Sequence, residues 1–192
     1  MHTPKLQRLE AFSDAIIAIA ITLLALELRV PVITSTSLTG GLKELVPYLP
    51  HLFTFILSFV TIAIFWVNHH QMTEHIEVLN RRIVWANILF LMFQTLIPFA
   101  TRVLAANSQH FINVANYSFI LFCGSLSFAL LHYLVHKKID HHLHINGKMI
   151  RRSLVGPALY GLATVAAFYF VPAAYILLAI PPLYYFLPKS VQ

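Results

Sequence analysis

The sequence has little charge and almost no cysteine. Only 10% of its 192 residues are Asp, Glu, Lys or Arg, whereas soluble domains average about 25%. A chain with so few charges cannot cover a globular surface in water, but its apolar residues, 58% of the total, can face lipid. The single cysteine, Cys123, excludes an internal disulfide framework. These shortages favour an integral membrane protein over a water-soluble one.

Long apolar runs predict the membrane spans, each of which needs about 20 residues. The runs are Phe12–Leu28, Leu45–Met72, Ile83–Thr101, Val103–His136 and Ser153–Pro188. The last run is too long for one span, and Pro172 near its middle favours a hairpin of two helices. A signal peptide is not expected, because Asp14 interrupts the first run. The sequence therefore predicts an all-α, polytopic membrane protein in which residues 1–192 form one domain of six transmembrane helices.

The basic residues are spread unevenly between the two sides that six spans create. Both termini then lie on the same side, which holds ten of the 13 Lys and Arg residues. These are Lys5, Arg8, Arg81, Arg82, Lys137, Lys138, Lys148, Arg151, Arg152 and Lys189, and the other three are Arg29, Lys43 and Arg102. Since cytoplasmic loops are enriched in Lys and Arg, we expect a multi-pass protein of the cell membrane with cytoplasmic termini. The net charge of +6 then reflects topology, and no nucleic-acid partner is expected.

The first apolar run has two distinct faces when it is drawn as a helix. At about 100° per residue, large apolar side chains fall in one stripe and small ones in another. The large stripe is Phe12, Ile16, Ile19, Leu23 and Leu26, and the small stripe is Ala11, Ala15, Ala18, Thr22 and Ala25. The small stripe is suited to close packing against a neighbouring helix, whereas the large stripe can face lipid, the core, or a space that is not protein. Asp14 lies opposite the large stripe, where a carboxylate must find a partner inside its own subunit.

Three polar segments near the ends of the spans form a recognisable pattern. Residues 8–14 read R-L-E-A-F-S-D, an R-x-x-x-F-S-D motif at the entry to the first helix. Residues 65–70 read F-W-V-N-H-H at the end of the second span, and residues 82–87 read R-I-V-W-A-N at the start of the third. Together these segments resemble the signature of the transmembrane protein 175 family, in its single-repeat bacterial branch. The resemblance covers essentially the whole chain.

The resemblance implies a potassium-selective cation channel, a homotetramer in which the first helix of each subunit lines a central pore. The family's hydrophobic constriction falls on Ile19, Leu23 and Leu26, and its polar pore-lining position falls on Thr22. Family members lack the carbonyl filter loop of ordinary potassium channels, and this sequence has no T-V-G-Y-G stretch. Potassium is then the transported ion, the partners are other copies of the chain and the lipid bilayer, and no cofactor is expected.

The pore residues and the motif residues have separate physical roles in this interpretation. Four copies of the large stripe around an axis form apolar rings, which expel water and block ions when they are narrow. Thr22 offers a hydroxyl oxygen to a partly dehydrated cation. The residues assigned to the motif and its bracing are Arg8, Phe12, Ser13, Asp14, His69, His70 and Trp85. Asp14 is expected to accept hydrogen bonds from one of the last three, which braces the motif rather than contacting ions.

A secondary or proton-coupled transporter is the alternative function, with Asp14 and Glu27 as intramembrane carboxylates. Transporters usually show inverted repeats and broken helices, and the first four predicted spans show neither. An intramembrane enzyme is a third class, but Ser13 and Asp14 lack the context of a catalytic nucleophile, so no enzyme activity is expected.

Four histidines gather in the loop after the fourth span, beside two lysines. They are His136, His141, His142 and His144. Imidazole pairs suit zinc, but no cysteine is near and the lysines repel cations. We therefore expect a solvated basic loop and no metal site.

Overall fold

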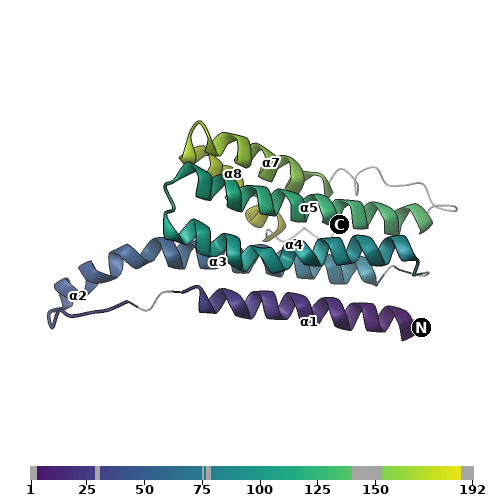
Figure 1. Cartoon of the computed structure of the whole chain (residues 1–192), viewed down its shortest axis with the longest axis horizontal. Coiled ribbons are helices and arrows are strands. Elements are labelled where there is room, and N and C mark those ends of the chain that lie inside the picture. The colour runs from purple at the N-terminus through teal and green to yellow at the C-terminus, as the bar shows by residue number, and fades with distance from the viewer. Residues whose placement is uncertain (1–3, 29–30, 75, 77–78, 140–152, 187–192) are drawn as a thin grey trace.

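The computed structural model of the chain describes residues 4–28, 31–74, 76, 79–139 and 153–186, and helices make up nearly all of these residues (Figure 1). The elements are α1 (Pro4–Leu26), α2 (Leu38–Leu45), the 3-10 helix η1 (Val46–Tyr48), α3 (Leu49–Thr73), α4 (Arg81–Ala106), α5 (Phe111–Ile139), α7 (Val155–Ala167) and α8 (Val171–Phe186). The predicted all-α fold is confirmed.

Four helical stretches are long and apolar enough to cross a membrane. They are Pro4–Leu26, the continuous stretch Leu38–Thr73, Arg81–Ala106 and Phe111–His136. The predicted break in the last apolar run is present, because α7 ends at Ala167 and α8 begins at Val171. Pro172 is thus in the first turn of α8, where a proline removes no intrahelical hydrogen bond.

The two helices of this hairpin are shorter than full spans. With 13 and 16 residues, they extend about 20 and 24 Å at about 1.5 Å per residue. The hydrocarbon core of a bilayer is about 30 Å thick. The six predicted spans therefore correspond to four long helices and one short apolar hairpin.

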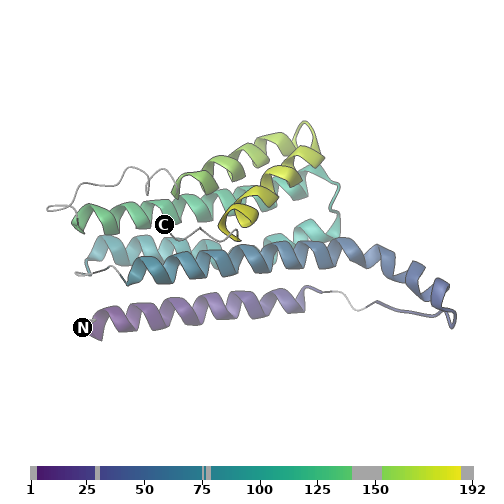
Figure 2. The same cartoon turned by 180° about the vertical axis from the view of Figure 1, so that it is seen from behind.

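The helices form three layers (Figures 1 and 2). α1 lies alone on one side and packs against α3 and α4, which form the middle layer. α5, α7 and α8 form the third layer. At the end opposite the N-terminus, α2 and η1 extend beyond the bundle. The described helices therefore cover α1 on one side only.

Aromatic rings fill the core between the middle and third layers. The ring centroids of Phe65 and Phe90 are 5.7 Å apart, and those of Phe90 and Phe128 are 5.3 Å apart. Phe65 and Phe128 complete the triangle at 6.0 Å. The three rings come from α3, α4 and α5, so this cluster joins the two layers.

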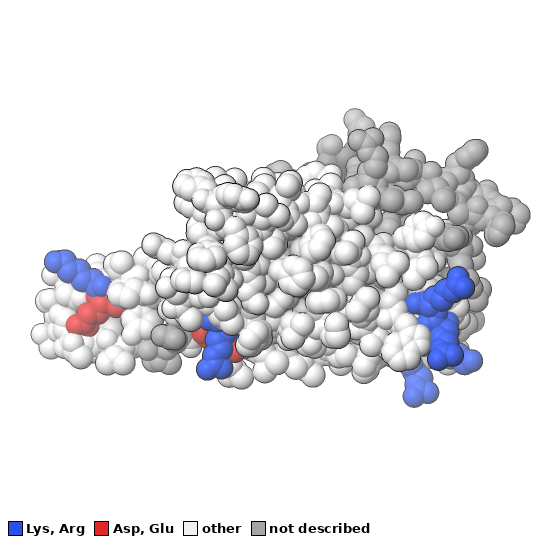
Figure 3. Space-filling model, turned by 45° about the horizontal axis from the view of Figure 1, so that its top comes forward, with Lys and Arg blue, Asp and Glu red and all other residues white. Residues whose placement is uncertain are grey.

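The charged residues lie mainly near the ends of the bundle. Lys5 and Arg8 are at the start of α1 and Arg81 and Arg82 are at the start of α4, at the same end of the bundle. In Figure 3, Lys and Arg gather at the end where α4 begins, and most of the surface between the two ends is uncharged. This distribution suits a multi-pass membrane protein.

A buried cluster of hydroxyl groups holds the middle of the bundle together. The Ser58 Oγ lies 2.7 Å from the Thr101 Oγ1 and 2.9 Å from the Tyr117 hydroxyl oxygen. All three residues are buried, and they come from α3, α4 and α5. Unpaired hydroxyl groups are costly in apolar surroundings, so this cluster fixes the register of the three helices.

Replacing Tyr117 by Phe is expected to lower stability by about 1 kcal/mol, because one buried hydrogen bond is lost while the ring still fills its space. Ser58→Ala should cost more, since it removes the centre of the cluster. The measurement is the thermal midpoint of the purified protein in mild detergent. Tyr169→Phe is the matched control, because Tyr169 is 86% exposed. If both Tyr variants melted alike, the cluster would have no part in stability.

Candidate functional site

In the part of the chain that the structure describes, one half of α1 is uncovered. Its buried residues lie along a single line and are Leu6, Ser13, Ile17, Ala20 and Leu24. The large stripe lies mostly outside this line: the exposed fractions of Phe12, Ile19, Leu23 and Leu26 are 52, 57, 42 and 78%. Ile16 differs from this pattern, because it borders the buried line and packs against the core. A long apolar surface is thus left without a partner among the described residues.

The small stripe lies on the same uncovered half of α1. Ala11, Ala15, Ala18, Thr22 and Ala25 are all exposed. At about 100° per residue, the two stripes together span about half the circumference of the helix. The uncovered half of α1 is wide enough for each stripe to contact a different surface outside the subunit.

Three side chains of the large stripe follow one another along the second half of α1. They are Ile19, Leu23 and Leu26, and at about 1.5 Å per residue they are about 6 and 4.5 Å apart along the helix axis. Thr22 lies between them in the sequence, and its hydroxyl donates a hydrogen bond to the Ile19 carbonyl at 2.9 Å. Because the proton is used within the helix, the lone pairs of the exposed oxygen remain available to another ligand.

A buried polar network holds α1 to the middle layer. The Asn87 Nδ2 donates to the Ser13 Oγ at 2.9 Å, and the Asn87 Oδ1 lies 2.7 Å from the His69 Nε2. The Ser13 hydroxyl donates to the Leu9 carbonyl at 2.9 Å. Ser13, Asn87 and His69 are 0, 1 and 2% exposed, and they come from α1, α4 and α3. This network joins all three motif segments of the sequence.

Asp14 has a different partner from those expected. Its carboxylate accepts a hydrogen bond from the Trp66 Nε1 at 3.0 Å. His69 instead bonds to Asn87, so it braces the motif through Ser13. The reason is geometric: Asp14 is half-buried at the edge of the α1–α3 contact, where Trp66 lies on the exposed side of α3 and His69 lies on the buried side.

The other two expected partners lie further away from the carboxylate. The His70 ring stacks on Trp66 with centroids 6.0 Å apart, and its Nε2 is 3.6 Å from the Glu74 carboxylate. Trp85 is 59% exposed on the outer side of α4. His70 therefore supports the donor of the Asp14 bond, and Trp85 is not part of this contact.

Trp66 and Asn87 are the two site residues that sequence reasoning missed. Both stand inside the segments 65–70 and 82–87 that carry the family resemblance. An indole N–H can only donate a hydrogen bond and an ionised carboxylate can only accept one. This complementarity could have indicated Trp66 as a partner of Asp14. The two remaining motif residues, Arg8 and Phe12, are exposed.

The second carboxylate of α1 lies at its far end. The Glu27 carboxylate is 3.6 Å from the Arg102 Nε, with side-chain exposures of 21 and 75%. This ion pair follows directly after Leu26 and joins the end of α1 to α4. Glu27 is therefore a paired charge at the end of the bundle.

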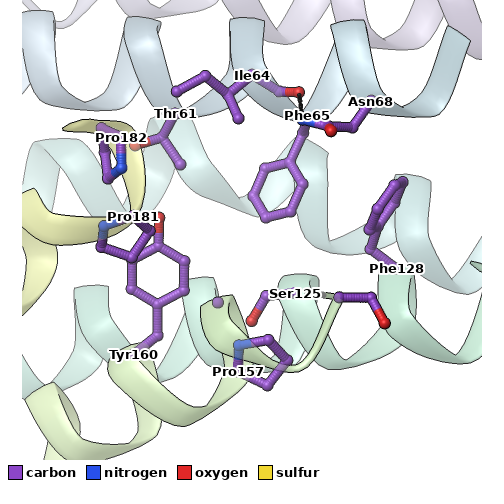
Figure 4. Close-up of a pocket in the computed structure, with 12 residues that line it drawn as sticks. Thr61, Ile64, Phe65, Asn68, Ser125, Phe128, Pro157, Tyr160, Pro181 and Pro182 are labelled. Atoms are coloured by element: carbon purple, nitrogen blue, oxygen red, sulfur yellow. Dashed lines mark hydrogen bonds between the residues drawn. The ribbon is translucent and has the colours of Figure 1, made fainter. Parts of the chain in front are cut away.

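A small cavity lies between α3, α5, α7 and α8 (Figure 4). Its volume of about 30 Å³ is room for roughly one water molecule. Polar groups in its wall are used within their own helices: the Asn68 Nδ2 donates to the Ile64 carbonyl at 2.7 Å, and Ser125 donates to Phe122 at 2.9 Å. The cavity is thus a small space between packed helices, with room for little more than a water molecule.

No cluster of three or more potential metal ligands occurs among the described residues. Three of the four loop histidines, His141, His142 and His144, lie outside the described residues, as do Arg29, Lys148, Arg151, Arg152 and Lys189.

The sequence of the chain is similar to those of known potassium channels. The family model described as endosomal/lysosomal potassium channel TMEM175 matches residues 8–98, which include all three motif segments. A potassium channel of Chryseobacterium sp. (strain P1-3) is 36% identical over 126 residues, which are 65% of this chain and 62% of that protein. A potassium channel of Streptomyces collinus is 36% identical over 130 residues, or 65% of this chain and 61% of its own length. The matches thus span less than two thirds of these relatives.

The fold has a close counterpart among solved structures. The crystal structure of a lysosomal potassium-selective channel TMEM175 homolog from Chamaesiphon minutus superimposes with a TM-score of 0.84 at 29% sequence identity. The superposition covers 98% of this chain and all of the other chain. The family model, the bacterial relatives and this structure lead to one conclusion: the chain is similar to channels of the TMEM175 family, bacterial homologues among them.

Proposed function

We propose that the chain forms a potassium-selective cation channel, in which α1 of each copy lines a central pore. The observation that carries this proposal is the uncovered half of α1, where Ile19, Leu23 and Leu26 stand in line. The bacterial relatives named potassium channels support the choice of ion. The direct test is potassium flux through the purified protein in liposomes under a potassium gradient. Absence of flux above that of empty liposomes would contradict the proposal.

One copy of α1 cannot enclose a pathway, so the proposal requires several copies. The two stripes of α1 differ in direction by about 100°. A helix in a ring needs one face toward the axis and another toward its neighbour, and small residues suit the helix–helix contact. We assign the large stripe to the axis and the alanines of the small stripe to the neighbour. Thr22 lies at the border of the two stripes, about 40° from Leu26, and is assigned to the axis. We assign four subunits to the ring, with residues 1–192 as a single channel domain in each.

The apolar side chains are proposed to form the constriction of the pore. A ring of four Ile19 side chains has no polar atom that can replace the water around a cation, and Leu23 and Leu26 add two further rings. When such rings are narrow they expel water, and ions then cannot pass. A slight widening rehydrates the rings and permits conduction.

Thr22 is proposed to provide the polar contact for a partly dehydrated cation. Its hydroxyl proton is donated to the Ile19 carbonyl, so the oxygen presents lone pairs away from its own helix. Four such oxygens would form a weakly polar ring between apolar rings. This arrangement supports modest selectivity, because it contains no carboxylate.

The two carboxylates of α1 favour the channel over a transporter. A coupled carrier would use an intramembrane carboxylate that changes its partner during transport. Asp14 is held by Trp66, and Glu27 is paired with Arg102 at the far end of the helix. We assign both to structure, and we place the termini in the cytoplasm because the basic residues gather at the end where α1 and α4 begin.

The oligomeric state is the first prediction of this proposal. The purified protein in mild detergent should have the mass of a homotetramer, because a closed ring of α1 helices is needed to surround a pathway. Native mass spectrometry measures it directly. Monomers or dimers as the sole species would count heavily against a pore lined by α1.

The second prediction concerns Ile19. Ile19→Asn should wet the constriction and raise potassium flux in liposomes severalfold, whereas Ile19→Trp should narrow the ring and reduce flux. Ile17 is not a suitable control. Its side chain is 1% exposed, so a polar replacement there would destabilise the fold and could change flux for that reason. Ile176 on α8 is a better match, since it is 64% exposed compared with 57% for Ile19. Equal effects of Asn at positions 19 and 176 would refute the pore assignment.

The third prediction concerns Asp14. Asp14→Asn keeps the size but loses the charge, and charge-assisted hydrogen bonds are roughly twice as strong as neutral ones. We expect a loss of about 1 kcal/mol, measured as a lower thermal midpoint of the assembled protein. Trp66→Phe should have a similar effect, and the double variant should be little worse than either single variant. A stable oligomer with changed ion selectivity alone would show that Asp14 faces the pore.

A further inference from the structure

A groove runs along α4 and α5 at the end of the bundle where α4 begins. Its mouth, with a volume of about 700 Å³, is lined by Arg81, Arg82 and Trp85 and is bordered by Leu89 and Leu130. The same two leucines border a second hollow of about 590 Å³, whose wall is almost entirely apolar and includes Phe93 and Leu126. The shared leucines place the two hollows next to each other, and we treat them as the two parts of one groove.

The mouth of the groove carries two positive charges. Arg81 and Arg82 are exposed at the first two positions of α4, after the Asn80 cap. Within the described ranges, neither arginine forms an ion pair. The positive end of the α4 dipole adds to the two guanidinium charges. This part of the groove therefore favours an anion.

The length and chemistry of the groove match one leaflet of a bilayer. Arg82 and Phe93 are eleven residues apart on α4, which corresponds to about 16 Å along the helix. Half of the hydrocarbon core is about 15 Å. Trp85, next to the arginines, is 59% exposed at the depth where tryptophan marks the membrane interface. The groove thus begins at headgroup level and ends near the midplane.

We propose that this groove binds an anionic phospholipid. Its phosphate accepts hydrogen bonds from Arg81 and Arg82, whose guanidinium groups suit phosphate oxygens. One acyl chain lies along Leu89 and Leu130 toward Phe93. Basic pockets between membrane helices are suited to acidic headgroups, and the apolar half of the groove requires a chain rather than a free phosphate. The site is separate from α1 and does not depend on ion conduction.

The test compares two lipids with identical acyl chains. The full-length protein is purified in mild detergent with phosphatidylglycerol or phosphatidylcholine, and retained lipid is counted by native mass spectrometry. Phosphatidylglycerol should be preferred. R81Q/R82Q should lower that preference roughly tenfold or more, since each basic residue at an anionic surface favours binding about fivefold.

Matched controls separate the site from net charge. Lys5→Gln with Lys43→Gln removes the same charge outside the groove and should keep the preference. Leu130→Trp keeps both arginines but fills the groove, so it should lower retention of both lipids. An equal loss in the two double variants would mean that the preference follows net charge, and the site would be overturned.

A photoreactive residue distinguishes lipid from a neighbouring subunit. Benzoylphenylalanine at position 130 should form adducts with phosphatidylglycerol in vesicles that contain it. Covalent dimers of the chain in place of lipid adducts would assign the groove to a subunit contact and overturn the proposal. This measurement stands even if Leu130→Trp fails to fold.

Discussion

The buried network of Ser13, Asn87 and His69 is the constraint on which the rest of the structure depends. Its hydrogen bonds cannot be replaced by water in the interior, so breaking them leaves unpaired polar groups at a high cost. Turning α1 by one residue would move Ser13 by about 100° and break the network. The same rotation would turn the Ile19 side chain by about 100° relative to the rest of the bundle. The network therefore decides which half of α1 is left uncovered.

A lipid bilayer is an environment in which the uncovered half of α1 carries little free-energy penalty. Lipid is as apolar as the large stripe, so exposure of that stripe carries little penalty in a bilayer, and burial in a core is not required. Helix contacts must then come from close packing and from polar groups. The hydroxyl cluster around Ser58 serves the bundle in this way, and the bond between Trp66 and Asp14 supports the edge of α1. Apart from Asp14, most charges lie near the ends of the bundle, where Glu27 pairs with Arg102.

The charged side chains at the two ends of the bundle are paired to different extents. At the end where α4 begins, basic side chains are free of partners among the described residues and lead into an apolar groove. At the opposite end, α2 and η1 extend past the bundle, and Glu44 accepts hydrogen bonds from the Thr34 backbone and hydroxyl at 2.7 and 2.8 Å. One end is thus open to anionic partners, while at the other end the Glu27 and Glu44 carboxylates have partners within the chain.

Apolar runs and charge placement in the sequence determined the helical class, the positions of the long spans and the hairpin at Pro172, because a bilayer imposes a simple length rule. Helical periodicity in the first run also separated Ile19 from Ile17, because two positions that differ by two residues point to nearly opposite sides of a helix. Tertiary structure alone decided the partner of Asp14, since the choice between Trp66 and His69 depends on how α3 is rotated against α1. It also decided that the last two helices are short, because helix ends depend on local packing and not on the length of an apolar run.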